Sequence, residues 1–243
     1  MRNIILGMSA LALAAVSAPA FAQEEASDGF TVSGSVALVS DYRFRGVSLS
    51  GEEAAVQGAV TVGHESGLYA GFWGSSTTAQ FGTEIDAIVG YSTKLGGVTV
   101  DGGVTYYLYP NDSSAATDYF EPYLSVSGDV GPANLKVGAA YAFEGQNALF
   151  DNSIFYVFTD AKLAIPSTPL TAKAHLGYSK SDNFVVPGVS NDDYIDYSVG
   201  VEASWKSLTF GVSYVNTDIT KAFGAKEALG ADGAVLFTVG AAF

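Results

Sequence analysis

The sequence predicts an all-β fold, an up-and-down antiparallel transmembrane β-barrel of about 12 strands. Three features of the 243-residue chain predict it. Apolar and polar residues alternate along most of the chain, short connections alternate with long ones, and the last segment ends on an aromatic residue. In an outer-membrane barrel, lipid-facing and lumen-facing side chains alternate along every strand, and short turns at one rim alternate with longer loops at the other.

The N-terminus has the three regions of a secretory signal peptide. Met1-Arg2-Asn3 is positively charged, Ile4 to Val16 is apolar, and Ala20-Phe21-Ala22 supplies the small residues of a cleavage site. The apolar run is shorter than the roughly 20 residues that a spanning helix needs. We therefore expect residues 1–22 to be removed on export, and residues 23–243 to form one barrel domain that begins at Gln23.

Composition excludes several classes of protein. The chain has 14 Tyr, 15 Phe and 28 Gly but only 15% charged residues, which favours strands and tight turns over helices. Its net charge of −14 argues against nucleic-acid binding, which requires a basic surface. There is no cysteine, so disulfides, thiolate metal sites and cysteine nucleophiles are excluded.

About twelve segments alternate with the period of two that a half-buried strand requires, and bacterial barrels have an even number of strands. In chain order the expected strands are 30–44, 56–62, 68–72, 85–91, 98–108, 120–126, 135–143, 155–163, 172–178, 195–205, 208–214 and 233–243.

The connections between these segments are sorted by length. The tight ones are 64–67, 95–97, 131–132, 166–169 and 206–207. The long polar ones are 46–53, 75–82, 110–118, 145–152, 180–193 and 217–232. A soluble sandwich with Greek-key crossovers has no reason to sort its loops in this way. We expect the tight turns and both termini on the periplasmic side of an outer membrane.

Aromatic residues near the strand ends match the girdle that barrels place at the two membrane interfaces. The alternative is that they pack a soluble core. The expected girdle consists of Tyr42, Phe44, Tyr91, Tyr106, Tyr109, Phe143, Tyr178 and Tyr214. Lipid and lipopolysaccharide would then surround the barrel, and the barrel-assembly machinery would engage the last strand, which ends at Phe243.

The segment Ser40-Asp41-Tyr42-Arg43-Phe44-Arg45-Gly46-Val47-Ser48 is the most specific motif. It resembles the end of the first membrane crossing in the TorF-like porins, a proteobacterial outer-membrane family of unknown function. Two weaker matches are the run 84–91, which reads E-I-D-A-I-V-G-Y, and the run 119–123, which reads Y-F-E-P-Y. The resemblance covers essentially the whole mature chain. It implies an outer-membrane barrel and a channel, without a known substrate.

The charges of this motif are candidates for a site. On a strand, Asp41, Arg43 and Arg45 share the face opposite Tyr42 and Phe44. If the aromatics meet lipid, the charges point into the lumen, where they are tolerated.

Glu84 and Asp86 share a face in the same way, and we expect Arg43 or Arg45 to pair with Glu84, Asp86 or Glu121 across the interior. Such groups could form a charged constriction that selects permeants by its field, or a network that merely fills a narrow barrel. The candidate pore-lining residues are Asp41, Arg43, Arg45, Glu84, Asp86 and Glu121.

The predicted function is a porin-like channel for passive passage of small solutes or ions, without a cofactor. Acids outnumber bases among the expected lumen residues, which favours cations. The alternative is a narrow, non-conducting structural barrel whose surface loops bind a partner. We expect no enzyme, because no serine that could act with His64 or His175 lies in a recognisable motif such as G-x-S-x-G. We expect no metal site, because the acidic runs 111–112 and 191–193 lack EF-hand spacing.

Overall fold

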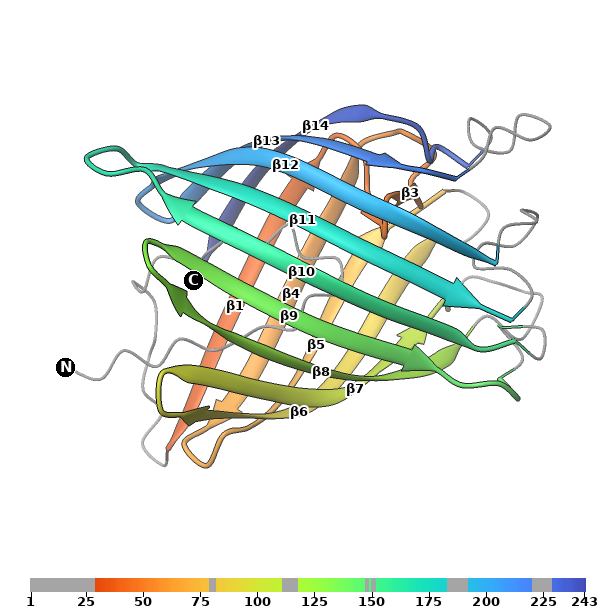
Figure 1. Ribbon diagram of the computed structural model, residues 1–243, viewed down its shortest axis with the longest axis horizontal. Coiled ribbons are helices and arrows are strands. Elements are labelled where there is room, and N and C mark those ends of the chain that lie inside the picture. Colours follow the sequence, from red (N-terminus) through yellow and green to blue (C-terminus); the bar gives the residue numbers. More distant parts are fainter. Residues whose placement is uncertain are drawn as a thin grey trace.

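Twelve antiparallel strands close into a barrel in the computed structural model, and a short two-stranded hairpin lies apart from the barrel sheet (Figure 1). The structure describes residues 29–78, 82–110, 118–146, 149, 152–182, 192–219 and 229–243. The barrel strands are β1 (Phe30–Val39), β4 (Ala55–His64), β5 (Leu68–Ser76), β6 (Thr83–Leu95), β7 (Val98–Leu108), β8 (Tyr119–Val130), β9 (Ala133–Ala142), β10 (Ile154–Ala164), β11 (Leu170–Ser181), β12 (Asp193–Trp205), β13 (Leu208–Thr217) and β14 (Ala234–Ala242). The hairpin consists of β2 (Arg43–Phe44) and β3 (Val47–Ser48). The described residues contain no helix that is long and apolar enough to cross a membrane. The predicted signal peptide, residues 1–22, lies outside the described residues.

Each barrel strand pairs with its neighbours in sequence, and β1 closes the ring against β14. At the seam, Leu38 is paired with Val239, and Gly34 and Phe243 exchange two backbone hydrogen bonds of 2.7 and 2.9 Å. The strands contain 9 to 13 residues, close to the 9–11 that a tilted strand needs to cross a bilayer. The prediction of a closed up-and-down barrel of twelve strands is confirmed.

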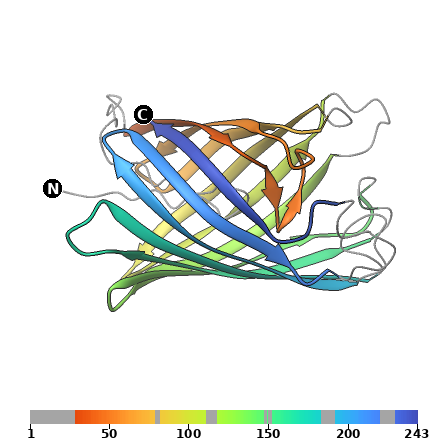
Figure 2. The ribbon, with the colours of Figure 1, turned by 90° about the horizontal axis from the view of Figure 1, so that it is seen from above.

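The two rims of the barrel differ as the sequence predicts. Tight turns join β4 to β5, β6 to β7, β8 to β9, β10 to β11 and β12 to β13, and the C-terminus lies at the same end (Figures 1 and 2). We call this end the short-turn rim. The longer connections meet at the opposite end, the loop rim. Any lumen residue can therefore be placed along the barrel axis from its distance to a short turn.

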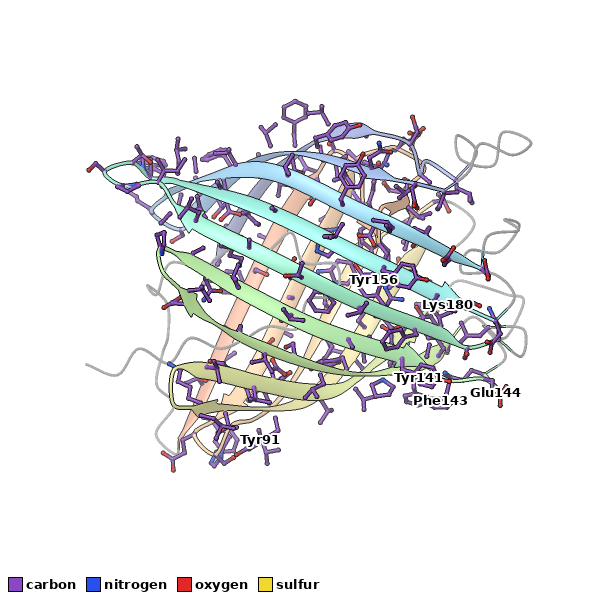
Figure 3. The ribbon with its side chains drawn as sticks, in the orientation of Figure 1. Tyr91, Tyr141, Phe143, Glu144, Tyr156 and Lys180 are labelled. Atoms are coloured by element: carbon purple, nitrogen blue, oxygen red, sulfur yellow. The ribbon has the colours of Figure 1, made fainter. Side chains whose placement is uncertain are left out.

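The outer surface is apolar and the inner surface is polar. Val36, Leu124 and Phe237 are exposed on the outside, as are most residues on the same face of the other strands. Aromatic side chains flank this apolar surface: Tyr91 lies near the short-turn rim and Phe143 near the loop rim (Figure 3). The closed sheet pairs each described barrel strand on both sides, and its apolar outer surface suits contact with lipid, as a transmembrane barrel requires.

The end of the first strand differs from the prediction. β1 ends at Val39 rather than at residue 44, and residues 40–54 fold into the lumen. Tyr42 and Phe44 consequently pack inside the barrel, against Trp73 and Tyr107 respectively. Tyr109, another expected girdle residue, also lies inside, where it contacts the interior aromatic cluster. The prediction that these three rings meet lipid is wrong, because each has aromatic or carboxylate partners in the lumen.

Candidate functional site

Residues 40–54, which we call the lumen hairpin, are the main feature of the interior. After Ser40 donates a backbone hydrogen bond of 2.9 Å to Phe237, the chain leaves the wall. β2 and β3 then pair through Arg43–Ser48 and Phe44–Val47. The tip is turned by positive φ angles at Arg45 (50°) and Gly46 (82°), a conformation that glycine adopts without strain.

The tip presses against the wall formed by β12 and β13. A Cβ atom added to Gly46 would collide with Thr217 and would lie 3.1 Å from Cβ of Asp196. The hydroxyl of Tyr194 donates a 3.0 Å hydrogen bond to the carbonyl of Arg45. The hairpin therefore spans the lumen from the β1 wall to the β12 wall, near the loop rim.

Arg45 anchors the hairpin to a third wall strand. Its Nη2 atom lies 2.7 Å from both carboxylate oxygens of Glu121 on β8. The guanidinium also stacks over the ring of Tyr156, 4.1 Å from its centroid. The side chains of Arg45 and Glu121 are only 7% and 0% exposed. The predicted pairing of a motif arginine with Glu121 is confirmed, and it is a dry ion pair.

Asp41 and Arg43 hold the base of the hairpin together. Arg43 Nε lies 2.6 Å from Asp41, and Nη1 donates a 2.6 Å bond to the carbonyl of Asp232. The hydroxyls of Ser48 and Ser50 donate to Asp41 at 2.6 and 3.0 Å. Arg43 thus pairs within the hairpin rather than with Glu84, Asp86 or Glu121.

Glu84 and Asp86 lie on β6, facing the hairpin. Glu84 accepts hydrogen bonds from the hydroxyls of Tyr42 (2.8 Å) and Tyr109 (3.1 Å) instead of from an arginine. Asp86 is buried, and its Oδ1 atom has no hydrogen-bond partner among the described residues. The structure therefore gathers all six predicted site residues around the hairpin, but the interactions that they make are mostly different from those expected.

A second group of charges extends from the hairpin tip toward the short-turn rim. His175 on β11 is 2.7 Å from Asp160 on β10 and 2.9 Å from Asp196 on β12, and the Tyr156 hydroxyl is 2.9 Å from its Nε2 atom. Lys173 lies 3.0 Å from Glu202. The side chains of His175 and Lys173 are 23% and 26% exposed, which places them in contact with water.

Sequence reasoning placed these charges inside the barrel but did not bring them together. Their alternation with apolar residues is enough to predict that they point into the lumen. Nothing in the sequence predicts the strand register that makes them neighbours. The hydrogen-bond partners of His175 include Tyr156, Asp160 and Asp196. Among the described residues, no group of three or more His, Asp or Glu side chains could hold a metal ion.

Comparisons with known proteins agree with this architecture. The NanC porin superposes with a TM-score of 0.60 at 14% identity, covering 87% of this chain and 98% of that one. The KdgM porin, solved in complex with disordered oligogalacturonate, gives 0.56 at 11% identity, covering 87% and 97%. At such identities the likeness is one of fold. No curated protein matches the chain.

The family assignment comes from the sequence. The expected resemblance to the TorF-like porins is supported at its coarser level, a bacterial outer-membrane type of barrel without an assigned function, while the TorF name stays a prediction. The model of one family matches residues 23–243, and the chain therefore belongs to the family described as bacterial protein of unknown function (Gcw_chp).

Proposed function

We propose that this protein is a porin-like channel of the outer membrane through which small solutes pass passively, with the lumen hairpin as its constriction. The observation that carries the proposal is the inverted distribution of polarity. Apolar residues cover the outside, while charged residues that contact water, such as Lys173 and Asp160, line the inside. A polar, wet interior serves the passage of hydrophilic solutes. The fold shared with NanC and KdgM supports the same proposal.

The constriction belongs to the loop-end half of the lumen. The candidate pore-lining residues Asp41, Arg43, Arg45, Glu84 and Asp86 all lie in or against the hairpin, as does Glu121 on the facing wall. A permeant that enters from the loop rim must pass this segment. We retain cation preference as part of the proposal, because acids outnumber bases among the inward residues.

The packing around the hairpin also favours a second candidate, a plugged structural barrel whose loops bind a partner. Glu121 is fully buried and Arg45 nearly so, so the hairpin leaves little open space beside that ion pair. In both candidates the assembly machinery engages the last strand ending at Phe243, and lipid with lipopolysaccharide surrounds the outside.

Removal of the hairpin separates the two candidates. In one variant residues 41–53 are replaced by a short Gly-Ser linker, and in a control the β10–β11 turn at residues 165–169, outside the lumen, is replaced by Asn-Gly. Single-channel conductance is measured in planar bilayers. For a channel with a constriction, we expect the wild type and the control to conduct equally, and the hairpin-free variant to conduct about twofold more or better, since the free cross-section grows.

Two other outcomes would overturn the channel proposal. If the wild type does not conduct and the hairpin-free variant does, the protein is a plugged barrel. If none of the three proteins conducts, although each is folded as judged by heat-modifiable gel mobility, the barrel has no pore.

A further inference from the structure

Three lysines lie side by side on the inner wall near the short-turn rim. Lys136, Lys162 and Lys173 face the lumen from the consecutive strands β9, β10 and β11. Lys162 and Lys173 are direct cross-strand partners, and Lys136 is opposite Asp160, two residues before Lys162. We call these three side chains the lysine ledge.

This arrangement is unfavourable in the empty barrel. Like charges placed directly opposite each other on neighbouring strands are destabilising. Two of the nearby carboxylates have other partners: Glu202 lies 3.0 Å from Lys173, and Asp160 lies 2.7 Å from His175. In the described part of the chain, no carboxylate oxygen lies within ion-pair distance of Lys162, although Glu202 and Asp160 are charged neighbours of it together with Lys173. The Lys162 ammonium group can therefore receive a further anion, with Lys136 and Lys173 beside it.

The opposite wall has the complementary character. In the order of strands around the barrel, β9, β10 and β11 stand across from β1, β4 and β5. The inward residues of these three strands are uncharged in their described lengths, and toward the short-turn rim they carry hydroxyls on Thr31, Ser33, Ser35 and Thr61. Hydroxyl groups both donate and accept hydrogen bonds, so this wall suits a solute with several hydroxyls.

Resting on the proposed function, we propose that the lysine ledge binds the carboxylate of a small, polyhydroxylated solute while it crosses the short-turn half of the lumen. The carboxylate accepts charge-assisted hydrogen bonds from the ammonium groups, and the hydroxyls of the solute face the opposite wall. Such a local site is compatible with a net preference for small cations, since that preference reflects the field of the whole lumen and binding reflects three neighbouring groups.

Calorimetry on the refolded full-length protein in detergent micelles tests the proposal. The probes are glucuronate and its uncharged counterpart glucose. We expect glucuronate to bind about tenfold more tightly or better, a difference of about 1.4 kcal/mol. The double variant Lys162→Gln/Lys173→Gln should lose this difference. The matched control Lys180→Gln/Lys206→Gln removes the same charge from an exposed strand end (Figure 3) and from a turn, outside the ledge, and should keep it.

A salt series on the wild type keeps the test decisive if the ledge variant does not fold. Between about 0.1 and 1 M salt the Debye length falls from about 10 to 3 Å, so glucuronate binding should weaken while glucose binding stays unchanged. Equal wild-type affinities for the two probes, salt-independent glucuronate binding, or unchanged glucuronate binding in a folded ledge variant would each overturn the site. If the protein binds glucuronate but does not conduct, the channel proposal fails and the binding site stands. If it conducts but binds glucuronate and glucose equally, the binding site fails and the channel proposal stands.

Discussion

The two halves of the lumen contain the same kinds of residue but use them differently. In the loop-end half, the hairpin fills the interior, and Arg45 and Glu121 form a bidentate pair that is almost completely buried. In the short-turn half no such hairpin is present among the described residues, and the side chains of Lys173 and His175 remain about a quarter exposed. A nearly dry charge such as Arg45 must be satisfied by the protein itself, whereas a partly exposed charge such as Lys173 keeps contact with water and can also be satisfied by a solute. The same inward position on a strand is thus structural in one half and available for binding in the other.

The largest test of this contrast removes one carboxylate from each half. Glu121→Gln removes the carboxylate that pairs with the buried Arg45 guanidinium, and Glu202→Gln removes the carboxylate 3.0 Å from the partly hydrated Lys173. We expect the first change to lower the free energy of unfolding by about 3–5 kcal/mol. The second should lower it by about 1 kcal/mol or less, because water compensates the lysine. Urea titrations of the two variants in detergent measure the difference, and equal losses would remove the distinction between a dry and a wet half.

The second test concerns the tip of the hairpin. Gly46 and Gly145 have nearly the same φ, 82° and 83°, but an added Cβ meets Thr217 and Asp196 at Gly46 and meets nothing within 4 Å at Gly145. Gly145→Ala should cost about 1–2 kcal/mol from its backbone conformation alone. Gly46→Ala should cost about 1–3 kcal/mol more, because the tip has no room to shift. Thermal unfolding compares the two variants. Matching losses would show that the tip is loosely packed.

The smallest expected effect is on ion preference. Arg43→Gln/Arg45→Gln and Lys162→Gln/Lys173→Gln each remove two positive charges from the lumen, so both should raise the preference for cations. The lysine variant should shift the reversal potential more, because Lys173 is 26% exposed whereas the side chains of Arg43 and Arg45 are 2% and 7% exposed and paired with acids. Reversal potentials under a salt gradient, with mean salt near about 0.1 M to limit screening, provide the measurement. A larger shift from the arginines would mean that the permeant path passes directly along the hairpin.

Most of the barrel could be predicted from the sequence, because side chains along a strand point alternately into the lumen and outward. Along the expected strands, a period of two puts Glu121, Tyr156 and Lys173 on the polar face and Phe237 on the apolar face. The structure places them in the lumen and on the outside respectively. The hairpin could not be predicted in this way. A hairpin inside a barrel has the same period of two as the wall, so the alternation through residue 44 carried no sign that the chain departs after Val39.

The residues of the site could be predicted more easily than the interactions between them. Pairing of Arg45 with Glu121 followed from opposite charge in a shared interior. The pairing of Arg43 with Asp41 could not be predicted. Residues two apart on an extended strand point the same way but are separated along the strand. The two side chains meet in a segment that has left the barrel wall. The neighbouring positions of Lys162 and Lys173 depend on register, which the β10–β11 turn sets rather than the composition of either strand.

The seam between β1 and β14 has a consequence for the order of events during folding. The backbone bonds between Gly34 and Phe243 join segments from opposite ends of the chain, so they form only after almost all of it has emerged from the translocation machinery. Contacts between such distant segments are slow to form, because the intervening chain must first be ordered. Until they form, both edge strands have unsatisfied backbone groups that hydrocarbon cannot hydrate. The seam is therefore where an unfinished barrel is most vulnerable to pairing with another chain and where a helper protein that shields strand edges would have its greatest effect on yield.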